Sequence, residues 1–265
     1  MLSLKTTLRY TGPIFDTHTH GIDTESLDLM VSIQKRFGVE KCVLICHSPG
    51  IMRYAKKKYP GLFVFAKYFS GTMRFTEGVH SIAREIRSIR EEGYHLAKMQ
   101  SAPMMRGRAR VGPEDLRLHE DGMAPMFEAL QEEDLKFILH VSDPDTYYTQ
   151  RYTDKTTYST KERDLAELEG VLARYYNLQF QIAHFASQPE ARRLGNLARW
   201  FETYSNFNID TSSARWMSRE LSKNPADSKE FIEKYSSRIQ FGTDCVGFTD
   251  DVNYYEGRYS ALRTL

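Results

Sequence analysis

The sequence predicts a single (β/α)8 TIM barrel, an α/β fold in which eight parallel strands alternate with helices. Short apolar runs rich in β-branched and aromatic residues alternate with amphipathic stretches along the chain. Eight such runs in 265 residues give about 33 residues per unit, close to the roughly 30 that a strand and its crossover helix need. No linker or low-complexity segment interrupts the pattern, so residues 1–265 are expected to form one domain.

The strands are expected where apolar runs end in polar or ionisable residues. In chain order these runs are 13–20, 41–47, 62–68, 94–100, 136–141, 178–185, 206–210 and 239–244. Helices are expected where apolar residues recur every three or four positions, as at Val79, Ile82 and Ile86, at Leu165, Leu168 and Leu172, and at Ala191, Leu194 and Leu197. An open doubly wound sheet would place a Gly-rich turn after its first strand, and this chain has His-Thr-His-Gly there.

The composition excludes several classes of protein. Lys plus Arg sum to 36 and Asp plus Glu to 35, so the chain lacks the basic surplus that a nucleic-acid partner requires. No apolar run approaches the roughly 18 residues of a membrane helix. Three cysteines are too few for a disulfide framework, and the first ten residues lack the apolar core of a signal peptide. A cytoplasmic protein is therefore expected.

Ligand-type residues stand at the ends of four predicted strands. His18 and His20 lie two positions apart on the first strand, so both side chains point to the same side and can share a metal ion. His140, His184 and Asp244 end three other strands. A lone histidine at a strand end is more often structural, and Asp244 could cap the next segment. A barrel, however, gathers all these strand ends around one mouth, which favours a metal site.

These pieces resemble the amidohydrolase-2 branch of the amidohydrolase superfamily, which contains metal-dependent hydrolases, hydratases and non-oxidative decarboxylases. The matching segments are Asp16-Thr-His-Thr-His20, His140, Ala183-His-Phe185 and Phe241-Gly-Thr-Asp244. The resemblance covers essentially the whole chain. It implies that His18, His20, His140 and Asp244 hold a divalent metal, with Zn²⁺ favoured over Mn²⁺ or Fe²⁺, and that His184 is a nearby acid/base or orienting residue.

The residue types of this site suggest its chemistry. Three neutral imidazoles and one carboxylate around Zn²⁺ leave a net charge of +1 and an open position, at which the pKa of water drops toward 7. Asp244 can take the proton from water and pass it to a leaving group, while His184 can stabilise charge on the substrate oxygen. The two roles can also be exchanged, and the sequence does not decide between them.

Lys98 stands near the end of the fourth predicted strand and has three interpretations. It could be carbamylated and bridge two metals, remain an ammonium that binds a substrate carboxylate, or extend its charge to solvent as a structural lysine. The ammonium interpretation is favoured because it needs no modification. A purely structural lysine among apolar neighbours is disfavoured because an unpaired buried charge is costly.

Further substrate contacts are expected from the loops that follow the strands. The two long connections are 101–121 and 142–159, and the candidates that we select are Arg106, Arg110, Arg215 and Tyr148. His47, Lys67, Tyr68, Asp210 and Trp216 are weaker candidates. Charged loop residues are usually only solvated, so one arginine at most of the cluster 106–110 is expected to reach the pocket. Such an arginine would favour a carboxylate-bearing, aromatic substrate.

The sequence thus predicts an enzyme that acts on a small molecule. The leading hypothesis is a hydrolase that cleaves an ester, lactone or amide of an organic acid. A decarboxylase is the rival within the same family, and a non-catalytic barrel that binds a metal or metabolite is the alternative outside it. The resemblance suggests a homodimer. The 21 residues after Asp244 predict a short last helix near 254–265, or a natural chain that continues further.

Overall fold

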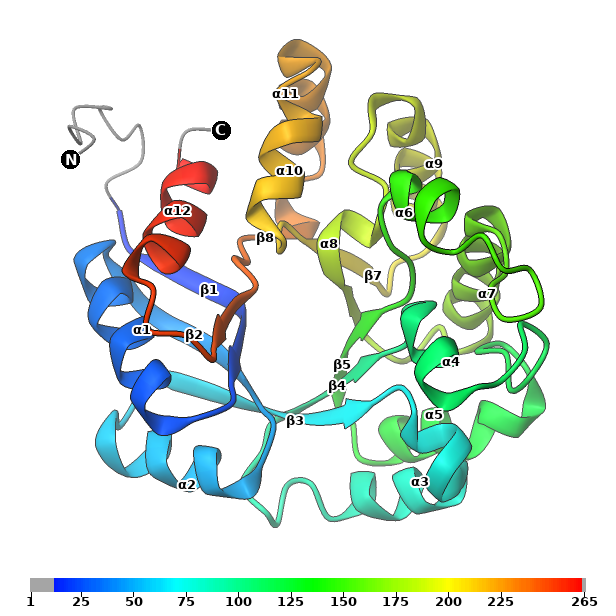
Figure 1. The fold of residues 1–265 in the computed structure, drawn as a ribbon, viewed down its shortest axis with the longest axis horizontal. Helices are drawn as coiled ribbons and strands as arrows, with labels where there is room; N and C mark the ends of the chain where they lie inside the picture. The colour runs from blue at the N-terminus through cyan, green and yellow to red at the C-terminus, as the bar shows by residue number, and fades with distance from the viewer. Residues whose placement is uncertain (1–11, 264–265) are drawn as a thin grey trace. The chain divides into compact units, whose positions relative to one another are not determined.

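The computed structural model describes residues 12–263 and alternates strands with helices along this length (Figure 1). It divides into two compact units. Unit 1 comprises Met1–Phe65 and Asp210–Leu265, and unit 2 comprises Ala66–Ile209. Neighbouring strands pair in parallel within each unit, as the predicted α/β class requires. Closure into one barrel and a single domain stay predictions.

The strands of unit 1 are centred on β1 (Ile14–Gly21), which carries His18 and His20. It pairs with β2 (Val39–Cys46) on one side and β9 (Cys245–Gly247) on the other. Helices α1 (Thr24–Arg36) and α12 (Val252–Arg263), blue and red in Figure 1, contact each other beside these strands. The remaining elements are α2 (Pro49–Lys58), α10 (Ala214–Leu221), α11 (Pro225–Lys234), η3 (Ser236–Arg238) and β8 (Ile239–Gln240).

Unit 2 contains a run of parallel strands. They are ordered β3 (Phe63–Ser70, in this unit from Ala66), β4 (Leu96–Gln100), β5 (Lys136–His140), β6 (Phe180–Ile182) and β7 (Phe207–Asp210, in this unit to Ile209). The helices are η1 (Arg74–Gly78), α3 (Val79–Arg87), α4 (Met104–Ala109), η2 (Asp121–Met123), α5 (Ala124–Glu132), α6 (Asp145–Gln150), α7 (Lys161–Arg174), α8 (Ala183–Ala186) and α9 (Ala191–Thr203). The core between strands and helices is aromatic, with Phe127 stacked on Tyr175 at 4.5 Å.

Helix starts follow ordinary capping chemistry. Asp23 caps α1 by accepting a hydrogen bond from the Ser26 amide, and Thr160 caps α7 by accepting from the Arg163 amide. Helix α7 is the helix that the apolar residues Leu165 and Leu168 predict, and both leucines are buried. Three expected helical stripes therefore correspond to α3, α7 and α9.

Two predicted strands are wrong at their carboxyl ends. The expected strand 178–185 ends at Ile182 because four consecutive residues, His184 to Ser187, have φ between 49° and 59°. Left-handed backbone cannot continue a strand. The expected strand 239–244 ends at Gln240, and Asp244 with φ 56° precedes a separate strand, β9, that the sequence analysis missed.

The ends of the chain qualify two further expectations. The predicted last helix is present as α12, which begins at Val252, and residues 264 and 265 lie outside the described residues. The expected absence of a signal peptide concerns residues 1–10, which also lie outside them. Among residues 12–263, no helix has both the length and the apolar character needed to cross a membrane.

Candidate metal centre

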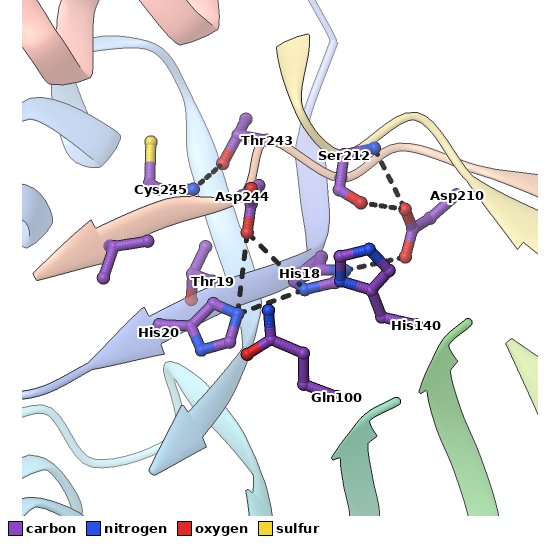
Figure 2. A network of polar contacts seen from close by, with 12 residues as sticks. His18, Thr19, His20, Gln100, His140, Asp210, Ser212, Thr243, Asp244 and Cys245 are labelled. Carbon is purple, nitrogen blue, oxygen red and sulfur yellow. Dashed lines mark hydrogen bonds and ion pairs between the residues drawn. The ribbon is translucent and has the colours of Figure 1, made fainter. Parts of the chain in front are cut away.

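Two imidazoles and one carboxylate of unit 1 converge on one point (Figure 2). The Nε2 atoms of His18 and His20 lie 3.2 Å apart, because both residues project from the same side of β1. The Oδ1 atom of Asp244 lies 3.7 Å from Nε2 of His18 and 3.6 Å from Nε2 of His20. Both histidines are buried, whereas the Asp244 side chain is 22% exposed.

Hydrogen bonds to β1 fix the backbone that carries Asp244. The amide of Asp244 donates to the carbonyl of His18 at 2.9 Å. One residue earlier, Thr243 donates its amide and its hydroxyl to the buried carboxylate of Asp16, at 3.1 and 2.6 Å. Burial raises the pKa of Asp16 to about 6, although hydrogen bonds from Thr243 and from Tyr259 oppose this rise. Asp16 is therefore a positioning residue for the Asp244 loop.

The other ring nitrogen of each histidine has a partner that sets the ring orientation. Nδ1 of His18 lies 2.9 Å from Oδ2 of the buried Asp210, and Nδ1 of His20 lies 2.9 Å from Nε2 of His47. A hydrogen on each Nδ1 satisfies both contacts and leaves each Nε2 with its lone pair. Asp210 is itself held by the amide of Ser212 at 3.0 Å and by the Ser212 hydroxyl.

This arrangement suits a divalent cation. Two imidazole lone pairs and a carboxylate oxygen repel one another unless a positive charge lies between them. Ligands at 2.0–2.1 Å from a tetrahedral zinc are about 3.3 Å apart. The observed separations of 3.2, 3.6 and 3.7 Å are close to this value. The donor atoms present therefore fit the metal that the sequence analysis predicts.

His140 and His184, the other two predicted site histidines, belong to unit 2 and lie together there. His140 ends β5, and its ring is 4.3 Å from the ring of His184 in a perpendicular arrangement. Nε2 of His140 lies 2.9 Å from the carbonyl of Ser142 and 3.4 Å from the carboxylate of Asp143. A hydrogen on Nε2 satisfies both acceptors, so the lone pair of His140 is on Nδ1.

Lys98 is buried in the middle of β4 and only 2% exposed. It is followed two positions later by Gln100, which pairs in register with His140 on β5. Side chains two apart on a strand share a face, so Lys98, Gln100 and His140 lie on the same side of these strands. Lys98 thus lies on the same face as the predicted ligand His140, two residues further from the carboxyl end of β4.

The predicted substrate-contact residues divide into two groups. In the first group, the polar atoms are used within the protein. Arg106 is buried and donates Nη1 to the carbonyls of Gly112 and Asp115. The hydroxyl of Tyr148 forms hydrogen bonds with Asp164 and Ser142. Arg110 and Arg215 are exposed, at the end of α4 and on α10.

Two weaker candidates have roles that the sequence analysis did not foresee. Asp210 and His47 were expected to contact substrate, and they contact the imidazoles of His18 and His20 instead. The only indication in the sequence for Asp210 and His47 is their position at the end of a predicted strand. Ser212 and Thr243, which hold Asp210 and Asp16, were missed because single hydroxyl residues in loops carry no distinguishing pattern.

The parallel α/β fold brings a His-x-His pair on its first strand close to an aspartate that precedes β9, which makes this an α/β protein with a candidate metal site. The chain belongs to the amidohydrolase family: the family model described as Amidohydrolase matches residues 68–264. This membership supports an enzyme and confirms the resemblance seen in the sequence. None of the curated proteins matches the chain.

Three solved structures show the fold that this chain shares with them. The 5-carboxyvanillate decarboxylase from Sphingomonas paucimobilis is 13% identical, with a TM-score of 0.62 over 96% of this chain and 93% of that one. A candidate 2-pyrone-4,6-dicarboxylic acid hydrolase from Pseudomonas putida is 14% identical, with a TM-score of 0.58 over 96% and 91%. A zinc-bound amidohydrolase from Burkholderia multivorans is 12% identical, with a TM-score of 0.55 over 96% and 91%.

Proposed function

We propose that the chain is a metal-dependent hydrolase that cleaves an ester, lactone or amide bond of a small organic acid. The observation that carries this proposal is the convergence of two imidazole nitrogens and one carboxylate oxygen from His18, His20 and Asp244. When bound there, a divalent ion would supply a Lewis acid that activates water near neutral pH.

The ligands that we propose are His18 and His20 through Nε2, Asp244 through a carboxylate oxygen, and His140 through Nδ1. Zn²⁺ is favoured because imidazole and carboxylate ligands suit it and because the Burkholderia multivorans relative binds zinc. Mn²⁺ and Fe²⁺ are the alternatives. Elemental analysis of the purified protein distinguishes them, and one equivalent per chain is expected.

Asp244 is the residue that we propose as the general base. One of its oxygens faces the two imidazoles, and the other lies 3.9 Å from Nη1 of Arg258. Its partial exposure allows contact with water, so it can accept a proton and later return it to a leaving group. His184 would then stabilise negative charge on the substrate oxygen.

The substrate that we propose carries a carboxylate, because buried cationic side chains accompany the predicted ligand in unit 2. Lys98 is the leading candidate to bind it, since it shares the face of His140 and is buried. Arg106 and Tyr148 would contribute less, because their polar atoms already hold loops. Arg110 and Arg215 are secondary candidates that would need to turn inward from solvent.

The test is turnover by the zinc-loaded protein in water enriched in oxygen-18. The panel contains 2-pyrone-4,6-dicarboxylate, aryl esters of aromatic acids, and 5-carboxyvanillate. A hydrolase gives a product that contains the heavy oxygen, and this signal disappears when the metal is removed by a chelator and returns when zinc is restored.

A decarboxylase is the second candidate, because the Sphingomonas paucimobilis structure, with a TM-score of 0.62, is a 5-carboxyvanillate decarboxylase. Release of carbon dioxide without label in the organic product would replace the hydrolase proposal with this one. Zinc binding without conversion of any member of the panel would favour a non-catalytic metal-binding protein.

A further inference from the structure

Arg74 is a buried arginine that the sequence analysis did not single out. It begins η1, four residues after the end of β3, and its side chain is only 2% exposed. The guanidinium stacks on the ring of the neighbouring Phe75, with Cζ 4.5 Å from the ring centroid. A buried cation of this kind usually faces a carboxylate, because an isolated charge is costly to remove from water.

The hydrogen bonds of Arg74 leave most of its donors unused. Nη1 donates to the hydroxyl of Ser101 at 2.7 Å, whereas the buried Nε has no partner within residues 12–263. Within the same part of the chain, no Asp or Glu oxygen lies within ion-pair distance of this guanidinium. A guanidinium has five N–H donors in a planar fork that matches a carboxylate. Among the described residues, Arg74 therefore lacks the anionic partner that its burial calls for.

The two acidic groups whose charges act on Arg74 have polar partners of their own. Asp164 accepts hydrogen bonds from Tyr148 and Ser159, and Glu167 accepts one from the amide of Leu118. Burial raises the pKa of Asp164 to about 7, so it provides only part of a negative charge at neutral pH. Burial lowers the pKa of Arg74 to about 9, which leaves it charged. Within residues 12–263 the charge of Arg74 is thus compensated only indirectly, without an ion pair to a carboxylate.

Arg106 adds a second buried positive charge to the region around Phe75. Its guanidinium lies 5.8 Å from the Phe75 ring, so both arginines approach the same aromatic side chain. Arg106 donates Nη1 to two loop carbonyls, at Gly112 and Asp115, and is therefore held in place. Its charge increases the attraction of the region for an anion.

A short chain of contacts links Arg74 to the predicted ligand of unit 2. Arg74 donates to the Ser101 hydroxyl, and the Ser101 amide donates to the carbonyl of His140 at 2.6 Å. Ser101 follows β4 directly and His140 ends β5, so Arg74 reaches the carboxyl ends of both strands. In parallel α/β folds, ligands bind at this edge of the sheet.

We propose that Arg74 is a substrate-binding residue that pairs with one carboxylate of an organic acid at the carboxyl ends of β4 and β5. The inference deepens the proposed function and rests on it, because it names a second cationic residue, in addition to Lys98, that binds acidic substrates at the same site. The carboxylate supplies the missing counter-charge, Ser101 orients the guanidinium, and Phe75 holds its plane.

The test is binding of benzoate, isophthalate and succinate to the metal-free protein by isothermal titration calorimetry. The variants are Arg74→Met, Arg74→Lys and, as a matched control, Arg84→Met at an exposed arginine on α3 of the same unit. Arg74→Met is expected to weaken binding of the best acid about tenfold or more. Arg74→Lys keeps the charge without the planar fork and should be intermediate, and Arg84→Met should bind as the wild-type protein does.

Thermal unfolding of the same variants separates a binding role from a structural one. Because Arg74 makes one hydrogen bond and no ion pair with the residues that the structure describes, the Tm of Arg74→Met is expected to be unchanged or higher. A fall of more than about 4 °C together with lost binding would assign Arg74 a structural role and overturn the proposal. Wild-type affinity in Arg74→Met, or no binding of the three acids by the wild-type protein, would overturn it too.

The two measurements distinguish failure of the proposed metal site from failure of the proposed carboxylate site at Arg74. Zinc binding is measured separately, so a protein that binds isophthalate through Arg74 and fails to bind zinc contradicts the proposed function and leaves the subsite supported. A protein that binds zinc, with acid binding that is insensitive to Arg74, contradicts only the subsite.

Discussion

The Nδ1 atom of His18 lies 2.9 Å from Oδ2 of Asp210, and both side chains are fully buried. His20 has a different partner, since its Nδ1 lies 2.9 Å from Nε2 of His47. One predicted ligand is thus oriented by a carboxylate and the other by an imidazole. A carboxylate is a stronger acceptor for the Nδ1 hydrogen than an imidazole nitrogen, so the ring of His18 should be held more firmly in the orientation that presents Nε2.

Replacement of Asp210 by Asn is expected to lower zinc affinity by about 10- to 100-fold. Ser212 donates its amide and its hydroxyl to Oδ1 of Asp210, so the amide oxygen of the variant would occupy that position and the NH2 group would face His18. An NH2 donor favours the ring form with hydrogen on Nε2, which removes the ligand lone pair. Competition with a chromophoric chelator measures the affinity.

Ser212→Ala is the control for this experiment, because it removes a hydroxyl donor and keeps the carboxylate beside His18. Its zinc affinity should stay within about threefold of the wild-type value, since one hydrogen bond of typical strength contributes about 1 kcal/mol and acts here only through Asp210. Equal affinities in Asp210→Asn and the wild-type protein would show that the orientation of His18 does not depend on Asp210.

Replacement of His20 by Ala should abolish zinc binding without unfolding the protein. The side chain provides one of the three converging donor atoms and projects from a strand whose backbone pairing it does not alter. His80→Ala, at an exposed histidine on α3, is the matched control and should bind zinc normally. Circular dichroism and elemental analysis provide the two measurements. One equivalent of zinc retained by His20→Ala would contradict the proposed site.

The positions of three predicted site histidines follow from simple periodicity. His18, His20 and His140 lie at or near the ends of β1 and β5, and the expected boundaries of these strands agree with the observed ones within one residue. Apolar runs identify buried strands well, and alternation then fixes which side chains share a face. The partial prediction of the metal centre therefore depends on two regular strands.

The backbone conformations of His184 and Asp244 could not be predicted from strand periodicity. Both adopt positive φ, at 59° and 56°, in segments without glycine at those positions, and nothing in residue preferences indicates such backbone. Tertiary hydrogen bonds, such as that from the Asp244 amide to His18, stabilise these conformations. Arg74 was missed for a related reason, because it lies in a polar stretch after β3 and becomes notable only through its burial.

The free energy of unfolding should depend on pH through Asp164. Burial raises the pKa of its carboxyl to about 7 from 3.8, and the hydrogen bonds from Tyr148 and Ser159 only partly offset this. The folded state thus keeps a proton that the unfolded state loses. The stabilising contribution is fully present below pH 3.8 and is lost as the pH rises through about 7.

Asp164→Asn stays neutral and provides the reference for this dependence. The stability of the wild-type protein relative to that variant should fall by about 1.4 kcal/mol per pH unit between pH 5 and 7, and become constant above about pH 8. Urea unfolding at each pH measures the difference. A constant difference over this range would mean that the folded carboxyl is ionised throughout.

Gly242→Ala should disturb the metal centre through packing alone. An added Cβ would lie 3.0 Å from Cβ of His18 and 3.4 Å from Cβ of Asp210, so it would displace the pair whose contact orients the first ligand. Overpacking of this kind costs about 1–3 kcal/mol of stability, and zinc affinity should fall with it.

Gly195→Ala is the matched control, because its added Cβ meets nothing within 4 Å on helix α9. That change should stabilise the protein by about 0.5–1 kcal/mol and leave zinc affinity unchanged. Equal zinc affinities in the two glycine variants would show that the site tolerates movement of His18.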